Sequence, residues 1–511
     1  MIKKYKLLLC AIIASFQTYA LCGRDIVPFQ DGKTKGTVGT EHLSDCNPIL
    51  PLWEHIPDGE PHIFEDPDKP GKYRVYIYGS HDTLKNEYCG TDLVVWSAPL
   101  EDLSNWRYDG VIYANTNYPK DLRLMYAPDV VETIKDGIKR YYLYPNEQRE
   151  PKASVAIAES PKGPFINMGK SNLIGFDPAV LVDDDGRVYA YWGFKKSFAA
   201  ELDPLTMCTL KPGTKVVENM VSNLVDDDSY DATAEVQSKR FRFYEASSIR
   251  KIGHMYVFVY SRSPHKTENR GGGESLAYAY STTPLGPWTY GGPIISNGSL
   301  DNSCPVGNIH GGLVQLNGEW YIFYHRHTNG TRFARQACVE PVNIQIKGNT
   351  VKIDEVPCTS LGFNRKGLNP YKKYPAAIAC YFKGEAFAKA TYDTSINCNP
   401  IVNVKNNSII GYKYYNFDAL AGEMHRIQVD LIPKGADGTI DIMVDAPSKA
   451  EGGIKIGIIH LSSKTPPLIK AYSASLYGLN KIKGKRAIYL VCKSDSDKEI
   501  CEIFHLKFSS N

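Results

Sequence analysis

A hairpin pattern that recurs five times between residues 51 and 350 restricts the fold more than any other feature. In the clearest copy, Glu245 opens a strand that runs to Arg250, a turn follows, and a second strand returns over Met255–Tyr260. The β-branched and aromatic residues of these strands favour β-structure. Each copy begins with a polar residue and has a glycine at its turn. The five polar residues are Glu60, Asp129, Asp177, Glu245 and His310.

The copies follow one another at intervals of roughly 50 to 70 residues, a spacing typical of propeller blades. One hairpin cannot bury both of its faces, so a series of such units predicts an all-β chain with a five-bladed β-propeller. The first strand of each blade lines the central channel of a propeller. We therefore expect the four carboxylates and the histidine to meet on one axis.

Carboxylates gathered in a narrow channel indicate a chemical role, because burying several together is costly. Hydrolysis of a glycosidic bond needs one protonated carboxyl, which gives its proton to the leaving oxygen, and one ionised carboxylate, which activates water or attacks carbon. A third carboxylate raises the pKa of the acid by like-charge repulsion. Three carboxylates in one channel suit this reaction.

Composition and pattern divide the chain into five segments. Residues 1–22 have the features of an export signal, and residues 23–50 form a leader without periodicity. The propeller occupies residues 51–350, and residues 351–375 form a connector. Short alternating segments over residues 376–511 predict a β-sandwich.

The first segment predicts secretion or release into the periplasm. Its basic start, Ile2–Lys4, precedes an apolar stretch, Leu7–Phe16, that is too short for a stable membrane anchor. Lipoprotein anchoring through Cys22 is the less favoured alternative, because the large Leu21 stands where a small residue is expected. An oxidising compartment permits disulfides, and Cys492 and Cys501 flank a polar turn across which they could pair.

The formal net charge of +3 is too small to indicate a nucleic-acid partner, since Lys and Arg are scattered along the chain. We expect a monomer without a membrane span that takes an oligo- or polysaccharide as its substrate.

Several motifs resemble those of glycoside hydrolase family 43. They are Glu60-Pro61, Asp177 to Gly186, Tyr244 to Lys251 and Asn308 to Gly311. The resemblance implies a five-bladed propeller with inverting chemistry, in which Glu60 is the base, Asp177 tunes the acid and Glu245 is the acid. The family usually has Asp-Pro where this chain has Glu60-Pro61, and Asp58 is therefore the alternative base.

The same resemblance implies roles for three further residues. Asp129 is expected to contact substrate, and Arg335 to contact substrate or to orient a carboxylate. His310 is expected to bind substrate and to lie near a channel cation, commonly calcium, that it contacts through water. The chemistry itself requires no cofactor, so the calcium would be structural.

The C-terminal segment is similar to family 6 carbohydrate-binding modules near Ile409–Tyr412 and Ile488–Leu490. Its tyrosines offer ring faces that could stack on sugars. The alternative is that these rings join the sandwich to the propeller. The tyrosines with exposed-looking positions are Tyr412, Tyr414, Tyr415 and Tyr472.

The most favoured function is exo-acting removal of terminal α-L-arabinofuranose from plant-type polysaccharide. Long segments such as Asp82–Gly90 and Ser263–Glu274 would wall the channel into a pocket, which favours exo action. The same resemblance leaves open a β-xylosidase and a β-galactofuranosidase or galactan-cleaving enzyme. A non-catalytic carbohydrate-binding propeller is the alternative of a different class.

Overall fold

The computed structural model describes residues 46–115, 120, 122–135, 137–222, 240–264, 273–296, 307–394, 398–420 and 425–510. The expected export signal lies outside these residues. In the described part of the chain, no helix has the length and hydropathy needed to cross a membrane.

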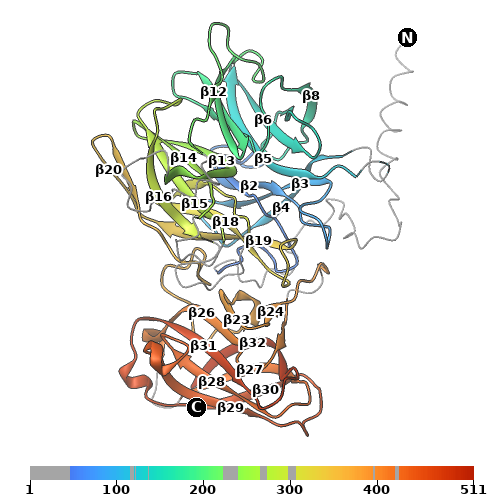
Figure 1. Ribbon diagram of the computed structural model, residues 1–511, viewed down its shortest axis with the longest axis vertical. Coiled ribbons are helices and arrows are strands. Elements are labelled where there is room, and N and C mark those ends of the chain that lie inside the picture. Colours follow the sequence, from blue (N-terminus) through green and yellow to red (C-terminus); the bar gives the residue numbers. More distant parts are fainter. Residues whose placement is uncertain are drawn as a thin grey trace.

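The predicted fold class is confirmed: Figure 1 shows a β-propeller above a β-sandwich, and almost every regular element is a strand. Four blades are antiparallel sheets of four strands and the fifth has three, with the strands of each blade following one another in sequence. The blades consist of β1 (Glu60–Glu65), β2 (Tyr73–Ser80), β3 (Asp92–Pro99) and β4 (Arg107–Ala114); β5 (Met125–Lys135), β6 (Ile138–Glu147), β7 (Ser154–Ala158) and β8 (Ile166–Lys170); β9 (Ala179–Val182), β10 (Val188–Phe194), β11 (Lys196–Leu202) and β12 (Val217–Glu218); β13 (Phe243–Ile252), β14 (Met255–Arg262), β15 (Ser275–Ser281) and β16 (Thr289–Ser296); and β17 (Leu313–Leu316), β18 (Glu319–His327) and β19 (Arg335–Val342).

The first strands of the blades form a closed ring around the channel. Each of β1, β5, β9, β13 and β17 contacts the next, and β17 returns to β1. The segment before β1 completes the fifth blade, because Ile49 N–H donates to Ala337 C=O and the Asn47 amide exchanges hydrogen bonds with Val339. The ring is therefore closed by both ends of the propeller sequence.

The turn glycines explain why the hairpin pattern is regular. All five adopt positive φ, between 60° and 85°, a region that glycine enters without steric cost. They are Gly71, Gly137, Gly186, Gly253 and Gly318. They lie at the end of the channel away from the polar residues, so the five polar positions gather at the opposite end.

The C-terminal part is a sandwich of two antiparallel sheets, as the sequence predicted, with the hairpin β20–β21 preceding it. One sheet has the order β24-β25-β32-β27-β30, with β22 also paired to β32, and the other has the order β23-β26-β31-β28-β29. The strands are β20 (Ile344–Lys347), β21 (Thr350–Ile353), β22 (Tyr374–Pro375), β23 (Tyr381–Lys383), β24 (Phe387–Ala388), β25 (Ile401–Val404), β26 (Ile409–Asn416), β27 (His425–Pro433), β28 (Gly438–Val444), β29 (Ile454–Leu461), β30 (Lys470–Leu476), β31 (Lys485–Lys493) and β32 (Cys501–Ser510). Short 3₁₀ turns occur at Ala376–Ile378, Phe417–Ala419, Lys449–Glu451 and Leu479–Lys481.

The tyrosines expected at the sandwich surface lie mainly inside it. Tyr412 and Tyr415 are completely buried, and Tyr414 and Tyr472 pack partly buried against the core between the two sheets. The expectation of exposed rings was wrong for Tyr412 and Tyr415, because an irregularity in β26 between these two residues turns both side chains into the core. The structure also leaves Cys492 and Cys501 as free thiols instead of the expected pair.

The sandwich shares its core with the propeller's N-terminal segment. Cys46 and Leu52 belong to the sandwich core, and the Asn399 amide donates to Leu52 C=O at 2.9 Å. The His55 and Tyr392 rings lie 4.6 Å apart between their centroids. Removal of the sandwich would expose this apolar surface to water.

We therefore expect a chain truncated after residue 375 to be insoluble or to unfold at a clearly lower temperature than the full chain. Exposure of large buried apolar side chains costs about 1.5–3 kcal/mol each. Soluble yield and thermal unfolding measure the effect. Full stability and unchanged turnover on a small aryl glycoside after truncation would show that the propeller folds independently.

Candidate active site

Three carboxylates lie where the first strands begin: Asp58 and Asp177 are buried, and Glu245 is partly exposed. Asp177 stands two residues before β9, and its Oδ2 accepts a hydrogen bond from Ala246 N–H at 3.1 Å, directly after Glu245. The Asn146 amide donates to its other oxygen at 3.4 Å, and His310 Nδ1 is 3.7 Å from Oδ2. Asp177 is thus held against the backbone that carries Glu245, and burial raises its pKa to about 6.

Asp58 occupies the same position in the first blade as Asp177 in the third, two residues before β1. Both adopt left-handed backbone conformations, with φ of 56° and 48°. Such strained conformations cluster at functional sites. Arg335 Nη1 donates to Asp58 Oδ1 at 3.1 Å, and Ser80 Oγ donates to Oδ2 at 2.8 Å. Although burial alone would raise the pKa of Asp58, the positive charge of Arg335 and the hydrogen bond from Ser80 hold it at about 2, so this carboxylate is ionised.

Glu245 lies on β13 beside a bulge, and the following Ala246 has φ of 66°. Burial raises the Glu245 pKa well above its usual range, and the negative charges of Asp177, Glu274 and Asp58 raise it further. One carboxyl of the site is therefore kept protonated and another is kept ionised. This is the division of states that acid–base catalysis at one bond requires.

Glu274 is a fourth carboxyl at this site that the sequence analysis did not identify. Ser261 Oγ donates to its Oε2 at 2.7 Å, and Ser261 is the cross-strand partner of Glu245. Burial raises the Glu274 pKa to about 7. Glu274 lies outside the five hairpin positions, at the start of a third strand, so no repeat signal marks it.

We expect Glu274→Gln to move the alkaline limb of the kcat/KM profile to lower pH. Activity requires protonated Glu245, so it is lost as pH rises through the Glu245 pKa. Removal of the Glu274 charge lowers that pKa and brings the loss to lower pH. The matched control is Glu159→Gln, which removes a carboxylate that is 82% exposed. An unmoved limb would mean that Glu274 does not act on Glu245.

Glu60 lies deeper in the channel than the other three carboxyls. It is 2% exposed, its Oε1 is 2.7 Å from Arg250 Nη2, and Ser248 Oγ donates to that oxygen at 2.8 Å. Ser248 follows Glu245 on β13 across a bulge, and their partners on β14, Ser261 and Val259, are two residues apart, which corresponds to roughly 7 Å along the strand. Glu60 is thus engaged across the channel below the level of Glu245.

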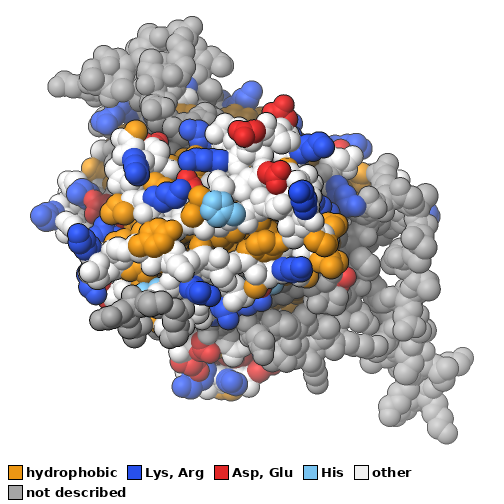
Figure 2. Space-filling view, turned by 90° about the horizontal axis from the view of Figure 1, so that it is seen from below, with side chains coloured by type: hydrophobic (Ala, Val, Ile, Leu, Met, Phe, Trp, Pro, Cys, Tyr) orange, Lys and Arg blue, Asp and Glu red, His pale blue; other side chains and the backbone are white. Residues whose placement is uncertain are grey.

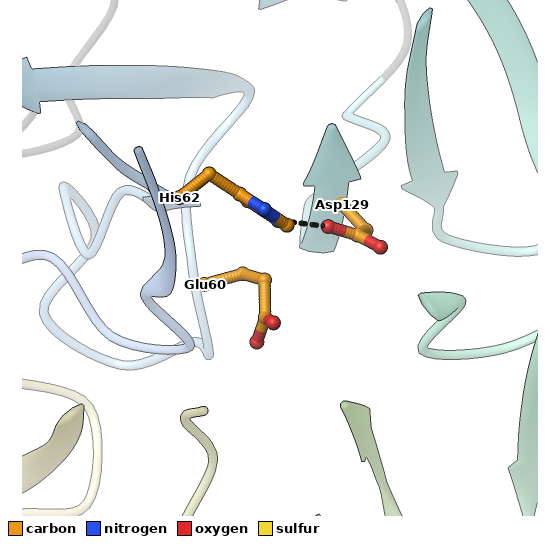
Figure 3. Close-up of side chains that lie close together, drawn as sticks. All are labelled: Glu60, His62 and Asp129. Atoms are coloured by element: carbon orange, nitrogen blue, oxygen red, sulfur yellow. Dashed lines mark hydrogen bonds and ion pairs between the residues drawn. The ribbon is translucent and has the colours of Figure 1, made fainter. Parts of the chain in front are cut away.

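Glu60 belongs to the one group of three metal-ligand side chains that the described residues bring together, with His62 and Asp129. Figure 3 shows these side chains, and the dashed line joins only His62 Nε2 and Asp129 Oδ1, 2.7 Å apart. Glu60 Oε2 has no hydrogen-bond partner in the described structure. Yet the Arg250 guanidinium already supplies a positive charge to Glu60, so the group fits a hydrogen-bonded network better than a calcium ion.

The remaining predicted residues also have protein partners. Asp129 Oδ2 accepts from Val180 N–H at 2.6 Å, so this carboxylate joins the first three blades through His62 and Val180. Arg335 is 1% exposed, and its guanidinium donates two hydrogen bonds to Asp82 and two to Asp58. His310 is buried beside Asp177 and is absent from the ligand group above.

His325 fixes the backbone of the base candidate, Asp58. Its Nδ1 accepts from Asp58 N–H at 3.1 Å, and its Nε2 lies 3.0 Å from Asn308 C=O, to which it donates. Burial and Arg335 lower the His325 pKa far below its usual range, so the ring is neutral. His325 lies on β18, the returning strand of the fifth hairpin, and Asp82 follows β2, so neither is one of the five leading polar residues and only the fold brings them to the site.

A five-bladed propeller with acid and base carboxyls at its channel mouth defines a class of glycoside-cleaving enzymes. A family model described as "Glycosyl hydrolases family 43" matches residues 70–349, and the chain belongs to this family. It is a glycoside hydrolase, and such enzymes need no cofactor for their chemistry. The matched range begins after both Asp58 and Glu60.

Named relatives agree with this assignment. A "Xylosidase/arabinosidase" of Thermoclostridium stercorarium is 37% identical over 72% of this chain and 82% of its own length. An "Arabinoxylan arabinofuranohydrolase" of Paenibacillus polymyxa is 24% identical over 89% of this chain and 72% of its own length. The crystal structure of a family 43 arabinoxylan arabinofuranohydrolase from Bacillus subtilis, in complex with cellotetraose, matches with a TM-score of 0.47 at 19% identity over 92% of this chain and 98% of that chain.

Proposed function

We propose that this protein is an exo-acting, inverting glycosidase that removes terminal α-L-arabinofuranose from arabinoxylan. The observation that carries the proposal is the pairing of an ionised carboxylate, Asp58, with a protonated one, Glu245, in one buried site. The names of the relatives, xylosidase/arabinosidase and arabinoxylan arabinofuranohydrolase, support the choice of substrate.

We assign the base to Asp58, the alternative from the sequence, in place of Glu60. Asp58 matches Asp177 in its position before the first strand of its blade and in its positive φ. Its charge acts on both Asp177 and Glu245. Glu60 is occupied by Arg250 and Ser248 deeper in the channel.

The mechanism follows from these states. Asp58 takes a proton from water as the water attacks the anomeric carbon, and Glu245 gives its proton to the leaving oxygen. Asp177 orients the Glu245 segment through Ala246 N–H and keeps the acid protonated by its charge. Arg335 holds Asp58 ionised and in place.

The test is incubation with arabinoxylan, arabinosylated xylotriose, linear xylotriose and galactan, followed by NMR of the first sugar released. We expect free arabinose with inverted anomeric configuration. Inversion requires room for a water molecule between the two catalytic carboxyls, which in inverting enzymes stand ~6.5–9.5 Å apart. A retained anomer would overturn the mechanism. Absence of any released sugar, with binding intact, would favour the non-catalytic propeller.

A β-xylosidase is the second candidate, because the 37% identical relative carries both activities in its name. Release of xylose from linear xylotriose in place of arabinose from the branched substrate identifies it. Release of sugar from galactan alone would identify the galactan-cleaving alternative.

We propose that the chain is exported and that the sandwich binds polysaccharide. A structural calcium in the channel stays a prediction, because the one three-ligand group in the described part of the chain already has Arg250 beside Glu60. Polysaccharide binding by the sandwich is supported by large apolar side chains that stay exposed on it, namely Ile454, Leu468, Ile469 and Tyr477. Figure 2, the view from below, shows hydrophobic side chains on this face of the molecule. N-terminal sequencing of the secreted protein, retention on insoluble xylan, and thermal unfolding with calcium and with chelator test the three in turn.

A further inference from the structure

A row of aromatic rings runs along the active-site end of the second, third and fourth blades. The Tyr126 and Phe176 ring centroids are 5.8 Å apart, Phe176 and Phe194 are 5.3 Å apart, and Phe194 and Tyr244 are 5.3 Å apart. Phe194 is 47% exposed, and the other three rings are partly exposed. Exposed phenylalanine at the centre of such a row is not explained by core packing.

The backbone fixes this row to the catalytic segments. Gly193 N–H donates to Phe176 C=O at 2.8 Å, and Lys195 N–H donates to Tyr244 C=O at 2.6 Å. Phe176 directly precedes Asp177, and Tyr244 directly precedes Glu245. The turn that carries Phe194 therefore connects Phe176 with Tyr244, the residues that directly precede Asp177 and Glu245. A side chain at Gly193 would meet Lys196 C=O at 2.0 Å, so this turn requires glycine.

The side of the site occupied by the row indicates its ligand. In an inverting glycosidase the leaving group departs beside the acid, whereas water attacks from the side of the base. Tyr244 directly precedes Glu245 and interacts with its charge, and the Phe194 ring lies against the Tyr244 ring. A second pair of rings, Tyr88 and Phe333, borders Arg335, whose guanidinium carbon lies 4.9 Å from the Tyr88 ring centroid.

We propose that Phe194, with Phe176, Tyr244 and Tyr126, forms a stacking platform for the xylose rings of the aglycone, the part of the substrate that leaves with the Glu245 proton. This inference rests on the proposed function and adds the subsite that would recognise the xylan backbone. The apolar face of a sugar ring packs on an aromatic face, and a row of rings accepts consecutive sugars. Lys195 Nζ, 5.6 Å from the Phe194 ring centroid, borders the platform with a hydrogen-bond donor.

The test measures binding of linear xylotetraose by calorimetry to full-length protein that carries Glu245→Gln, so that turnover plays no part. We expect Phe194→Ala on this background to weaken binding about tenfold, and Phe194→Tyr to retain it, because the ring is kept. The matched control is Tyr73→Ala, which removes a ring that is 49% exposed and pairs with Glu65 at the far end of the first blade. Unfolding temperatures of all variants show that they are folded.

Equal xylotetraose affinity with and without the Phe194 ring would overturn the platform, as would failure of the parent protein to bind xylotetraose. Neither result would touch the proposed function, which is judged by the sugar that the unmodified enzyme releases. Conversely, binding that depends on Phe194 in a protein that releases no sugar would retain the platform and reject the function.

Discussion

Glu245→Gln is expected to lower kcat on substrates with poor leaving groups, such as arabinosylated xylotriose, by about 10²–10⁴-fold. Glutamine keeps the shape of the side chain and part of its hydrogen bonding, but it has no proton to give to the departing oxygen. A nitrophenyl glycoside leaves without protonation, so the same variant is expected to lose less than about tenfold on that substrate. The measurement is kcat on both substrates at one pH.

The comparison of the two substrates distinguishes the loss of proton donation from a general loss of folded enzyme. A misfolded or destabilised variant would lose activity on both to the same extent. An equal loss in a variant with unchanged thermal unfolding would therefore remove Glu245 from the role of acid. The pH profile gives a second check, since loss of the acid should also remove the alkaline limb for the nitrophenyl substrate.

The propeller could be predicted because its signal is local and repeated. A strand, a glycine turn and a returning strand can be recognised within about 20 residues, and the five glycines have the positive φ that such a turn requires. The sandwich was also predictable from alternation. The inward direction of Tyr412 and Tyr415 was not, because a single strand does not reveal which of its faces meets the second sheet.

The site was predictable only in so far as it lies on the repeat. Asp177 and Glu245 open hairpins and lie together as expected. Glu274 precedes the third strand of its blade, and His325 lies on the returning strand of the fifth hairpin. Their closeness to the acid and the base depends on packing between strands and blades, which no periodicity records. The choice between Asp58 and Glu60 could not be made from sequence, because Asp58 lies two residues before β1 and Glu60 is its first residue. Only the side chains that each carboxylate contacts in the fold distinguish the two.

Asp58→Asn is expected to lower kcat by about 10²–10⁴-fold on every substrate, whatever its leaving group. Activation of water is needed for arabinosylated xylotriose and for a nitrophenyl glycoside alike, so the loss should be equal on the two. This equality distinguishes the base from the acid. The measurement is the ratio of the two kcat values, which should remain that of the unmodified enzyme.

Glu60→Gln is the matched control for Asp58→Asn, since it removes a second buried carboxylate that lies only two residues away. We expect it to retain activity within about tenfold, because Glu60 contacts Arg250 and Ser248 below the acid. Its main effect should be on stability, by about 1–3 kcal/mol, since the Arg250 guanidinium loses its buried anionic partner. Urea unfolding measures that change. If Glu60→Gln abolishes turnover in a stable protein while Asp58→Asn retains it, the base is Glu60, and the ion pair of Asp58 with Arg335 serves only to hold the first blade against the fifth.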